Sequence, residues 1–423
     1  MKGPAQKNPS GSSTGHRLLF VTLRYPPYVA GGYELLTRDA AEALRARGHN
    51  VHVLAGKGER FKDSGDVSPW LEPDLDGEDP FQVAMGARFR ERLRLDFLRS
   101  SNLEATSRAI AAFQPELVFF FNLGLVSLAP ILAARRAKVP TLGYLSDPWV
   151  ASHWLLDWRT SGRKPLRLFL LSKLWRCFRS YVDIGPALCC SQSLRERLVG
   201  EGLSSEATGV LHLGVPPDIE VATAKLEPPK REPGEALRVG CISALWKGKG
   251  QDVLVRALSL AREKKVPIEL WLAAPSATDF RRELEVLVFE LGLSTAVRFL
   301  DALTREDLSK ELQRTHVLCV PSVWEEPFPL STLEGMAHGL AVGVSTAGGS
   351  PEAIRDGEDG RVFPKGDAEA LAQGLLDWES DEPGRLAMGR AAQASARGRL
   401  NHRLFIDGIE RAIGKALAVG GAH

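Results

Sequence analysis

Short apolar runs alternate with segments of helical periodicity along most of this chain, and this alternation restricts the fold more than any other feature. The first unit has an apolar run at Leu18 to Leu23, a loop rich in Pro and Gly at Tyr25 to Gly32, and a helical pattern at Tyr33 to Arg47. Asn50 to Leu54 has the pattern of the next strand, so the chain opens with a βαβ unit. Because such a unit joins parallel strands, the sequence predicts an α/β fold.

The alternation continues and then starts a second time. More strands of the first sheet are predicted at Glu116–Phe121, Thr141–Leu145, Ala187–Cys190 and Val210–Leu213. The second set of strands is predicted at Leu237–Ile242, Ile268–Leu272, Val297–Leu300, Val317–Val320 and Ala341–Val344, with helices at Gln251–Glu263, Asp279–Leu291, Arg305–Gln313 and Ser331–His338. We therefore predict two Rossmann-like, doubly wound parallel-sheet domains that face each other across a cleft. Ligands of such folds bind at the carboxyl ends of the strands.

The predicted domain boundaries follow from composition. Residues 222–236 are charged and rich in Pro without periodicity, which indicates a linker between an N-terminal domain at 16–221 and a C-terminal domain at 237–395. A final helix at 396–423 could pack back on the first domain. Residues 1–15 lack an apolar stretch, so we expect a disordered tail that is neither a signal peptide nor an anchor. No run of about 18 apolar residues occurs, and the expected location is cytoplasmic.

Charge and cysteine content narrow the function further. The formal net charge of +2 gives no overall field that would favour nucleic acid, so we expect no nucleic-acid partner. The cysteines show no Cys-x-x-Cys spacing and are expected to be buried thiols in a reducing compartment. They are Cys177, Cys189, Cys190, Cys241 and Cys319.

The most informative segment runs from Pro321 to Gly339 and is expected to join a buried strand to a helix. Glu326 would lie in the loop and Glu334 in the first helical turn, so that both carboxylates could face one crevice and bind a vicinal diol. The amides around Leu330 to Leu333 would begin the helix and favour a diphosphate. Alternatively, Ser331-Thr-Leu-Glu334 fits a capping box, in which Glu334 only returns to the Ser331 amide.

This segment resembles the retaining glycosyltransferases of family 4, which have the GT-B fold. The resemblance rests on Glu-x7-Glu at Glu326 and Glu334 and on the stretch Ala347-Gly-Gly-Ser-Pro-Glu352. It implies that Glu326 contacts hydroxyls of the donor hexose and that Glu334 contacts the nucleotide ribose. Phe328, Leu330, Ser331 and Thr332 would complete this side of the donor site. Asp356 to Gly360 and Val362-Phe363 also resemble the family pattern, and the resemblance extends from Leu18 to about Leu375.

Two further loops are implicated by the same resemblance. Gly31-Gly32 is similar to a glycine loop that approaches the donor phosphate, although for a glycine pair taken alone an ordinary tight turn is favoured. Lys249, with Lys247 as the alternative, matches a Lys-Gly whose ammonium neutralises the leaving diphosphate. A solvated turn lysine is the competing explanation. The family usually has an Arg about six residues before this Lys, where Ser243 stands here.

Other positions depart from the family pattern. Ala273-Ala-Pro275 replaces a glycine-rich loop, and Pro329 replaces the glycine expected after Phe328, which removes one amide donor. Ser146-Asp147 stands where many relatives carry a His beside the Asp. Asp147 is thus the remaining polar candidate, and His153 is either a second one or a structural histidine.

Two patterns invite weaker hypotheses. Asp74-Leu-Asp76 matches an Asp-x-Asp metal motif but lies in a polar loop, so a solvated acidic loop is favoured and we predict no metal and no cofactor. The segment 163–179 combines cations with Leu, Phe and Trp at helical spacing. It could lie on an anionic membrane surface, with Arg88, Arg90, Arg92 and Arg94 adding to the patch, or pack on its own domain.

The resemblance predicts transfer of a hexose from a nucleoside diphosphate sugar to a hydroxyl acceptor, with retention of anomeric configuration. The acceptor could be a glycan, a lipid-linked molecule or a small molecule. Amides and Lys249 would stabilise the departing diphosphate, and Glu326, Lys249 and Asp147 are the candidate catalytic residues. The alternatives are a sugar-nucleotide epimerase or hydrolase on the same scaffold and a non-catalytic partner protein that kept the fold.

Overall fold

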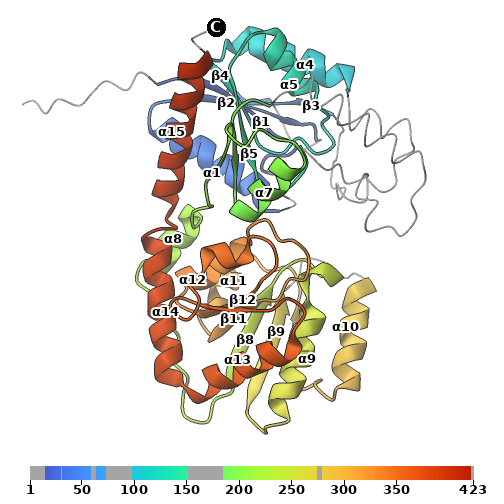
Figure 1. Ribbon diagram of the computed structural model, residues 1–423, viewed down its shortest axis with the longest axis vertical. Coiled ribbons are helices and arrows are strands. Elements are labelled where there is room, and N and C mark those ends of the chain that lie inside the picture. The colour runs from blue at the N-terminus through green and yellow to red at the C-terminus, as the bar shows by residue number, and fades with distance from the viewer. Residues whose placement is uncertain are drawn as a thin grey trace, which may run out of the picture. The chain divides into compact units, whose positions relative to one another are not determined.

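The structure is a computed structural model that describes residues 15–29, 31–58, 63–72, 98–150, 184–273 and 279–420 (Figure 1). The chain divides into two compact units. The first contains Met1–Tyr144, Trp149–Ala187 and Glu410–His423, and the second contains Leu145–Pro148 and Leu188–Ile409. No helix in the described ranges is long and apolar enough to cross a membrane.

The first sheet has seven strands in the order β3-β2-β1-β4-β5-β6-β7. Strand β1 is parallel to both neighbours, with Leu18 opposite Val51 on one side and Leu117 on the other. Its apolar side chains are buried on both faces, as expected for a central strand of a parallel sheet. The strands are β1 (Arg17–Val21), β2 (Asn50–Gly56), β3 (Val67–Leu71), β4 (Leu117–Phe120), β5 (Thr141–Leu145), β6 (Ala187–Cys189) and β7 (Thr208–Val210).

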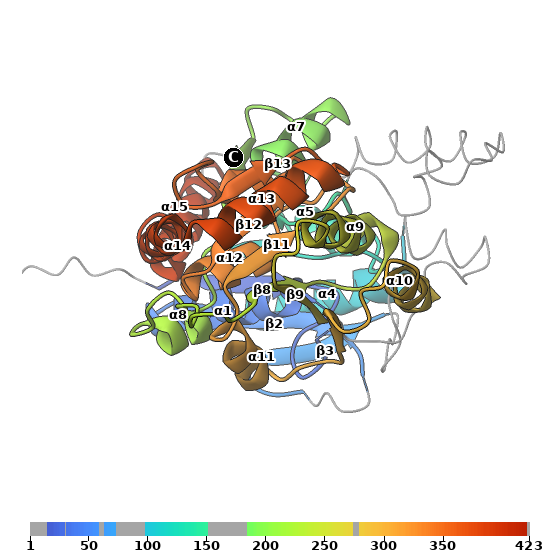
Figure 2. The same ribbon diagram turned by 90° about the horizontal axis from the view of Figure 1, so that it is seen from below.

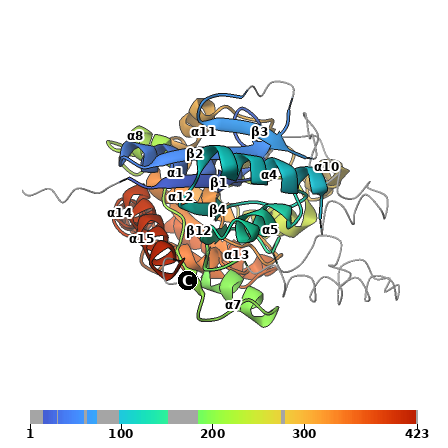
Figure 3. The ribbon, with the colours of Figure 1, turned by 90° about the horizontal axis from the view of Figure 1, so that it is seen from above.

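Helices follow these strands, and α4 and α5 lie side by side against the sheet (Figure 3). Helix α1 starts directly after the glycine pair, and its apolar stripe places Ala40, Ala41 and Leu44 in the core. The helices in this part of the chain are α1 (Gly32–Ala46), α4 (Ser100–Phe113), α5 (Ala129–Arg136), α7 (Gln192–Gly200) and α8 (Pro217–Thr223).

The second sheet has six strands in the order β10-β9-β8-β11-β12-β13, all in parallel pairs. The strand order reverses between β8 and β11, and such a reversal is where open α/β sheets bind ligands. The strands are β8 (Leu237–Ile242), β9 (Ile268–Ala273), β10 (Val297–Leu300), β11 (Val317–Val320), β12 (Ala341–Ser345) and β13 (Arg361–Phe363). The helices are α9 (Gln251–Arg262), α10 (Asp279–Glu290), α11 (Arg305–Leu312), α12 (Leu330–Ala337), α13 (Ala368–Ser380), α14 (Glu382–Arg397) and α15 (His402–Gly420), with short 3-10 turns η1 (Lys247–Lys249) and η2 (Ser350–Ala353).

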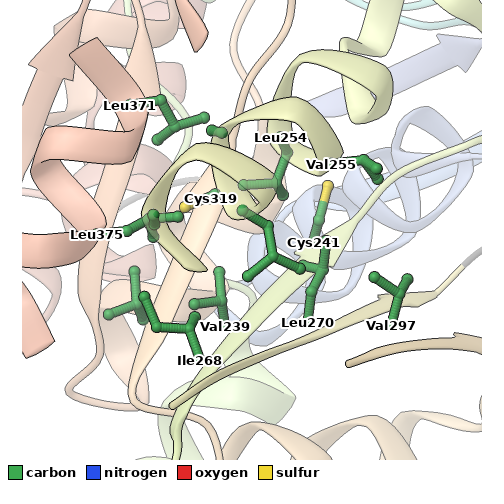
Figure 4. Close-up of a cluster of buried hydrophobic side chains, with 14 of the residues drawn as sticks. Val239, Cys241, Leu254, Val255, Ile268, Leu270, Val297, Cys319, Leu371 and Leu375 are labelled. Carbon is green, nitrogen blue, oxygen red and sulfur yellow. The ribbon is translucent and has the colours of Figure 1, made fainter. Parts of the chain in front are cut away.

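The core of the second sheet is built largely from α9 and α13, which lie next to each other, with α10 beside α9 (Figure 2). Leu254 and Val255 of α9 and Leu371 and Leu375 of α13 gather over the strands, where they meet Val239, Cys241, Ile268, Leu270, Val297 and Cys319 (Figure 4). Each such side chain contributes roughly 1.5–3 kcal/mol through burial. Helices α12 and α14 pack together on β12, so helices cover the sheet and hold its carboxyl-end loops in place.

The predicted fold class is confirmed, since both sheets are parallel and alternate with helices. Some predicted boundaries were wrong. The strand predicted at Val210–Leu213 is Thr208–Val210, and α12 begins at Leu330 rather than Ser331. The short strands β3 and β13 were missed, because five and three residues give little periodicity.

The stretch between α8 and β8, predicted as a linker, is fixed to the helices of the second unit. Arg231 Nη1 donates to Glu379 Oε1 at 2.9 Å, and the fully buried Arg385 donates from Nη2 to the Pro229 carbonyl at 2.9 Å. These bonds tie the stretch to α13 and α14. The domain boundaries themselves stay predictions.

Candidate functional site

The loops after β8 and β11 bring a carboxylate and an ammonium together at the reversal of strand order. Glu326 is only 6% exposed. Its Oε2 accepts hydrogen bonds from Lys249 Nζ at 2.6 Å, Trp324 Nε1 at 2.8 Å and Ser322 Oγ at 3.0 Å. Within the described residues, Oε1 accepts none. One oxygen is therefore saturated by charge-assisted bonds, while the other keeps its acceptor capacity.

The backbone explains how Lys249 reaches Glu326. The η1 turn docks on the loop after β11, with the Val323 amide donating to the Gly248 carbonyl at 2.8 Å. Gly250 follows with φ of 69°, and a Cβ at this position would overlap the Pro321 carbonyl oxygen. Only glycine satisfies both conditions, so it permits the close approach that sets Lys249 against the carboxylate. On the other side, the Gly349 amide donates to the Glu326 carbonyl at 2.7 Å.

Lys249, rather than the alternative Lys247, is the lysine that the structure brings to Glu326. Lys247 is exposed, whereas the Lys249 side chain is 18% exposed. The Lys249 ammonium also lies 5.2 Å from the centre of the Trp324 ring. The explanation of Lys249 as a solvated turn lysine is therefore wrong.

Ser243, at the position where an Arg was expected, has its hydroxyl engaged with the start of α9. Gln251 Nε2 donates to Ser243 Oγ at 2.7 Å and to the Ala244 carbonyl at 3.0 Å. In the described part of the chain, the buried Gln251 Oε1 has no hydrogen-bond partner. Ser243 and Gln251 thus form one small polar group beside the η1 turn.

Glu334 is held differently from Glu326. It is the fifth residue of α12, in the second helical turn rather than the first, and its Oε1 accepts from Arg305 Nη1 at 2.8 Å. Burial raises the pKa of Glu334 above its ordinary value, although Arg305 works in the opposite direction. The N-cap of α12 is Pro329, and among the described residues it has no side-chain cap hydrogen bond, while Glu334 turns to Arg305, so the capping-box alternative is wrong.

The first amides of α12 are partly used. The Thr332 amide donates to the Pro329 carbonyl at 3.1 Å, which removes one donor that the sequence had offered to a diphosphate. Thr332 is fully buried, and its Oγ1 lacks a partner in the described ranges. Leu330 and Ser331 are partly exposed at the start of the helix.

A cavity of about 360 Å³ opens beside Glu334 and is lined by α8, α11 and α12. Its wall includes Asp218, Ile219, Arg305, Ser309, Glu334 and His338. Glu326 is not among the lining residues; it lies in the loop before α12, whereas Glu334 lies in the helix, so the two carboxylates have different contact partners. Arg305 lies between two acids, because its Nε is 3.6 Å from Asp218 Oδ2.

Phe328 and Glu352 form a third group, because both contact His212. The sequence had not assigned a role to Glu352. Phe328 is buried and stacks on His212 with ring centres 5.3 Å apart. Glu352 accepts from the amides of Gln192 at 2.7 Å and Ser193 at 2.9 Å, and His212 Nε2 lies 2.9 Å from its Oε2. Burial favours a higher pKa for Glu352, but these bonds hold it below its ordinary value. Glu352 therefore occupies the free amides at the start of α7.

The remaining candidates lie at strand ends of the first sheet. Gly31 precedes α1, and its amide donates to Glu34 Oε2 at 2.9 Å, while Gly32 is the first residue of the helix. Asp147 follows the end of β5. His153, Asp74 and Asp76, the arginines at 88–94 and the segment 163–179 lie outside the described residues, as does most of the loop 273–275.

The cysteines and the acidic residues add no reactive centre in the described ranges. Cys189, Cys190, Cys241 and Cys319 are buried free thiols, as predicted, and burial raises the pKa of Cys241 to about 12. Among the described residues, no three His, Cys, Asp or Glu side chains are grouped to hold a metal ion.

Known proteins resemble this chain over most of its length. Residues 30–219 match the model of Glycosyltransferase Family 4, and residues 223–395 match that of Glycosyl transferases group 1. A D-inositol 3-phosphate glycosyltransferase of Corynebacterium urealyticum is 31% identical over 52% of this chain and 55% of its own length. The chain thus spans about half the length of this curated relative.

Solved structures show the same architecture. Sucrose-phosphate synthase from Thermosynechococcus elongatus superposes with a TM-score of 0.70 at 18% identity, covering 96% of this chain and all of the other (100%). HepE of Anabaena, solved in complex with UDP and glucose, superposes with a TM-score of 0.65 at 19% identity, covering 95% of this chain and 100% of the other. These structures confirm the GT-B fold. The two family models lie end to end on the sequence, and the chain therefore belongs to the glycosyltransferases of family 4.

Proposed function

We propose that this chain transfers a hexose from a nucleoside diphosphate sugar to a hydroxyl acceptor with retention of configuration. The observation that carries the proposal is the contact of 2.6 Å between Lys249 and Glu326 at the carboxyl ends of β8 and β11. An ammonium suits a diphosphate, and a carboxylate with a free oxygen suits a sugar hydroxyl. Both groups lie at the reversal of strand order, and this is where open α/β sheets bind their ligands.

In this proposal, Glu326 positions the donor hexose through Oε1. Its other oxygen is held by Lys249, Trp324 and Ser322, so the carboxylate is oriented before the donor arrives. Such preorganisation lowers the free energy needed to align the sugar for reaction. Ser322 is itself fixed, because Ser345 Oγ donates to its carbonyl.

Departure of the nucleoside diphosphate creates negative charge, which Lys249 would stabilise. The ammonium already faces Glu326, so it can bridge the Glu326 carboxylate and the β-phosphate of the donor. The amides of Leu330 and Ser331 at the start of α12 add donors on the same side. We propose that no metal is needed, and that the retained configuration follows from family membership.

Glu334 is the proposed ribose ligand. It lines the cavity of about 360 Å³, and two ribose hydroxyls could donate to its carboxylate in place of Arg305. The solved HepE complex with UDP-glucose supports a nucleotide-sugar donor of this kind. The relatives named D-inositol 3-phosphate glycosyltransferase do not fix the acceptor of this chain.

Thermal unfolding in the presence of UDP-, GDP-, ADP- and TDP-sugars tests the proposal. We expect the nucleotide sugars that carry one of these bases to raise the melting temperature of the parent, because a ligand that binds only the folded state stabilises it. Glu334→Ala should lose this shift while its own melting temperature changes little. Product analysis with donor alone then separates a transferase from a hydrolase or epimerase. A parent that binds no nucleotide sugar at millimolar concentration would contradict the proposal.

A further inference from the structure

An exposed tryptophan borders the Lys249–Glu326 contact, and neither the fold nor the proposed donor chemistry explains it. Trp246 is 42% exposed and immediately precedes the η1 turn. Two of the exposed large apolar side chains in the described ranges are aromatic, Trp246 and Phe289. Phe289 lies near the end of α10, in the part of the chain that leads to the start of β10 rather than in a loop at the carboxyl end of a strand. Ligand sites are commonly lined by aromatic side chains beside a few polar groups, so an exposed ring next to Lys249 and Glu326 fits a binding surface.

The ring of Trp246 is fixed in place by the same turn that carries Lys249. The Trp246 carbonyl accepts from the Lys249 amide at 2.9 Å. The indole lies across Gly248, where a Cβ would overlap it, and meets Trp324 edge to face with ring centres 5.4 Å apart. Such an arrangement restricts the ring before any ligand arrives, which reduces the entropy lost on binding.

The chain of contacts continues inward to the carboxylate. Trp324 donates from Nε1 to Glu326 Oε2, and the Lys249 ammonium lies over its ring. Exposure rises outward along this series, from 6% at Glu326 to 42% at Trp246. The inner, polar end suits the hydroxyls and phosphates of the donor. The outer, apolar end suits a ligand with a flat C–H face.

We propose that Trp246 is a specificity-determining residue that stacks on the C–H face of a pyranoside acceptor. This inference rests on the proposed function and names its acceptor class. Lys249 and Glu326 balance each other at the inner end, while at the outer end the indole supplies a flat apolar face and the exposed Lys247 beside it can donate hydrogen bonds to acceptor oxygens. Ring stacking therefore dominates recognition at this end of the site.

Saturation-transfer NMR with methyl glucoside, methyl galactoside and methyl mannoside tests the inference directly. We expect transfer from the parent to the ring C–H protons of at least one glycoside. Trp246→Ala should weaken that binding about fivefold, and Trp246→Phe should restore part of it. Phe289→Ala, which removes an exposed aromatic elsewhere, is the matched control and should bind as the parent does.

Two results would overturn the inference. One is a parent that gives no signal with any of the three glycosides, and the other is Trp246→Ala that binds like the parent. Because Trp246 is exposed, its variants should keep the parent's melting temperature and circular dichroism, and Trp246→Phe remains informative if the alanine variant unfolds. The nucleotide-sugar thermal shift should be the same in parent and Trp246→Ala. Loss of that shift in the parent contradicts the donor proposal and leaves the glycoside measurement standing.

Discussion

The two glutamates of the Glu-x7-Glu motif both pair with a cation, yet their surroundings differ. Glu326 lies in a loop whose Oε2 receives three donors from Lys249, Trp324 and Ser322. Glu334 lies within a helix and receives one, from the half-exposed Arg305. The first carboxylate is held from several directions, whereas the second can exchange its single partner for a ligand.

Electrostatics separates the two residues further. Burial raises the pKa of Glu334, because one flexible guanidinium does not replace the water that the helix excludes. Arg305 also has Asp218 within 3.6 Å as a second acid. We infer that Glu326 contributes mainly orientation and that Glu334 contributes exchangeable binding. The following predictions test this difference.

The largest effect is expected at Glu326. Glu326→Gln removes the negative charge opposite Lys249, so the ammonium is held less firmly and residue 326 binds the hexose hydroxyls more weakly. The transfer rate should therefore fall by about a hundredfold or more. Steady-state kinetics with the identified donor measures the change. Glu325→Gln is the matched control, because Glu325 is exposed and pairs with Lys365 instead. Equal losses in the two variants would contradict the assignment.

The residues Glu326 and Lys249 could be predicted from the sequence, but the hydrogen bonds that surround them could not. The apolar run at 317–320 and the following loop placed Glu326 at a strand end, and the Lys-Gly pair identified Lys249. The contributions of Ser322 and Trp324 depend on how two loops dock through the Gly248 carbonyl, for which no local pattern exists. Arg305 likewise stands 29 positions before Glu334, so only the packing of α11 and α12 reveals their contact.

The second effect concerns Glu334 and pH. Its pKa in the folded state lies above that in the unfolded state, so the folded state binds more protons between the two values, and stability should fall as pH rises through that interval. Donor affinity should rise over the same interval, because the ionised carboxylate accepts both ribose hydroxyls. Glu334→Gln should remove both trends and weaken donor binding about tenfold. Thermal melts and donor titrations across the acid range measure them.

If the titrations of Glu334→Gln kept their pH dependence, that dependence would belong to another titratable group. Asp218→Asn serves as the control, since Asp218 lines the same cavity and approaches Arg305 but has no proposed ribose contact. Its donor affinity where Glu334 is ionised should stay close to that of the parent, and because the Asp218 charge helps to raise the pKa of Glu334, the rise in affinity should move to lower pH.

A smaller effect is expected at Arg305. Arg305→Gln removes the cation that lowers the pKa of Glu334, so the rise in donor affinity should move to higher pH, and binding on the acid side should weaken about two- to fivefold. Arg305→Lys keeps the charge and should keep the parent profile. Donor titrations at several pH values compare the three proteins. An unshifted profile in Arg305→Gln would show that Arg305 does not influence the ionisation of Glu334.

The smallest effect is expected at Ser331, where sequence and structure disagree about the start of α12. The pattern Ser-x-x-Glu suggests a cap, but α12 begins at Leu330, so Ser331 is its second residue and Glu334 turns toward Arg305. Ser331→Ala should therefore change the free energy of unfolding by less than about 0.5 kcal/mol. Thr304→Ala is the comparison, because Thr304 Oγ1 accepts from the Asp307 amide and caps α11, and its loss should cost about 1 kcal/mol. Denaturant melts of both variants decide the point: a loss at Ser331 as large as at Thr304 would restore the capping box and make Glu334 a structural residue.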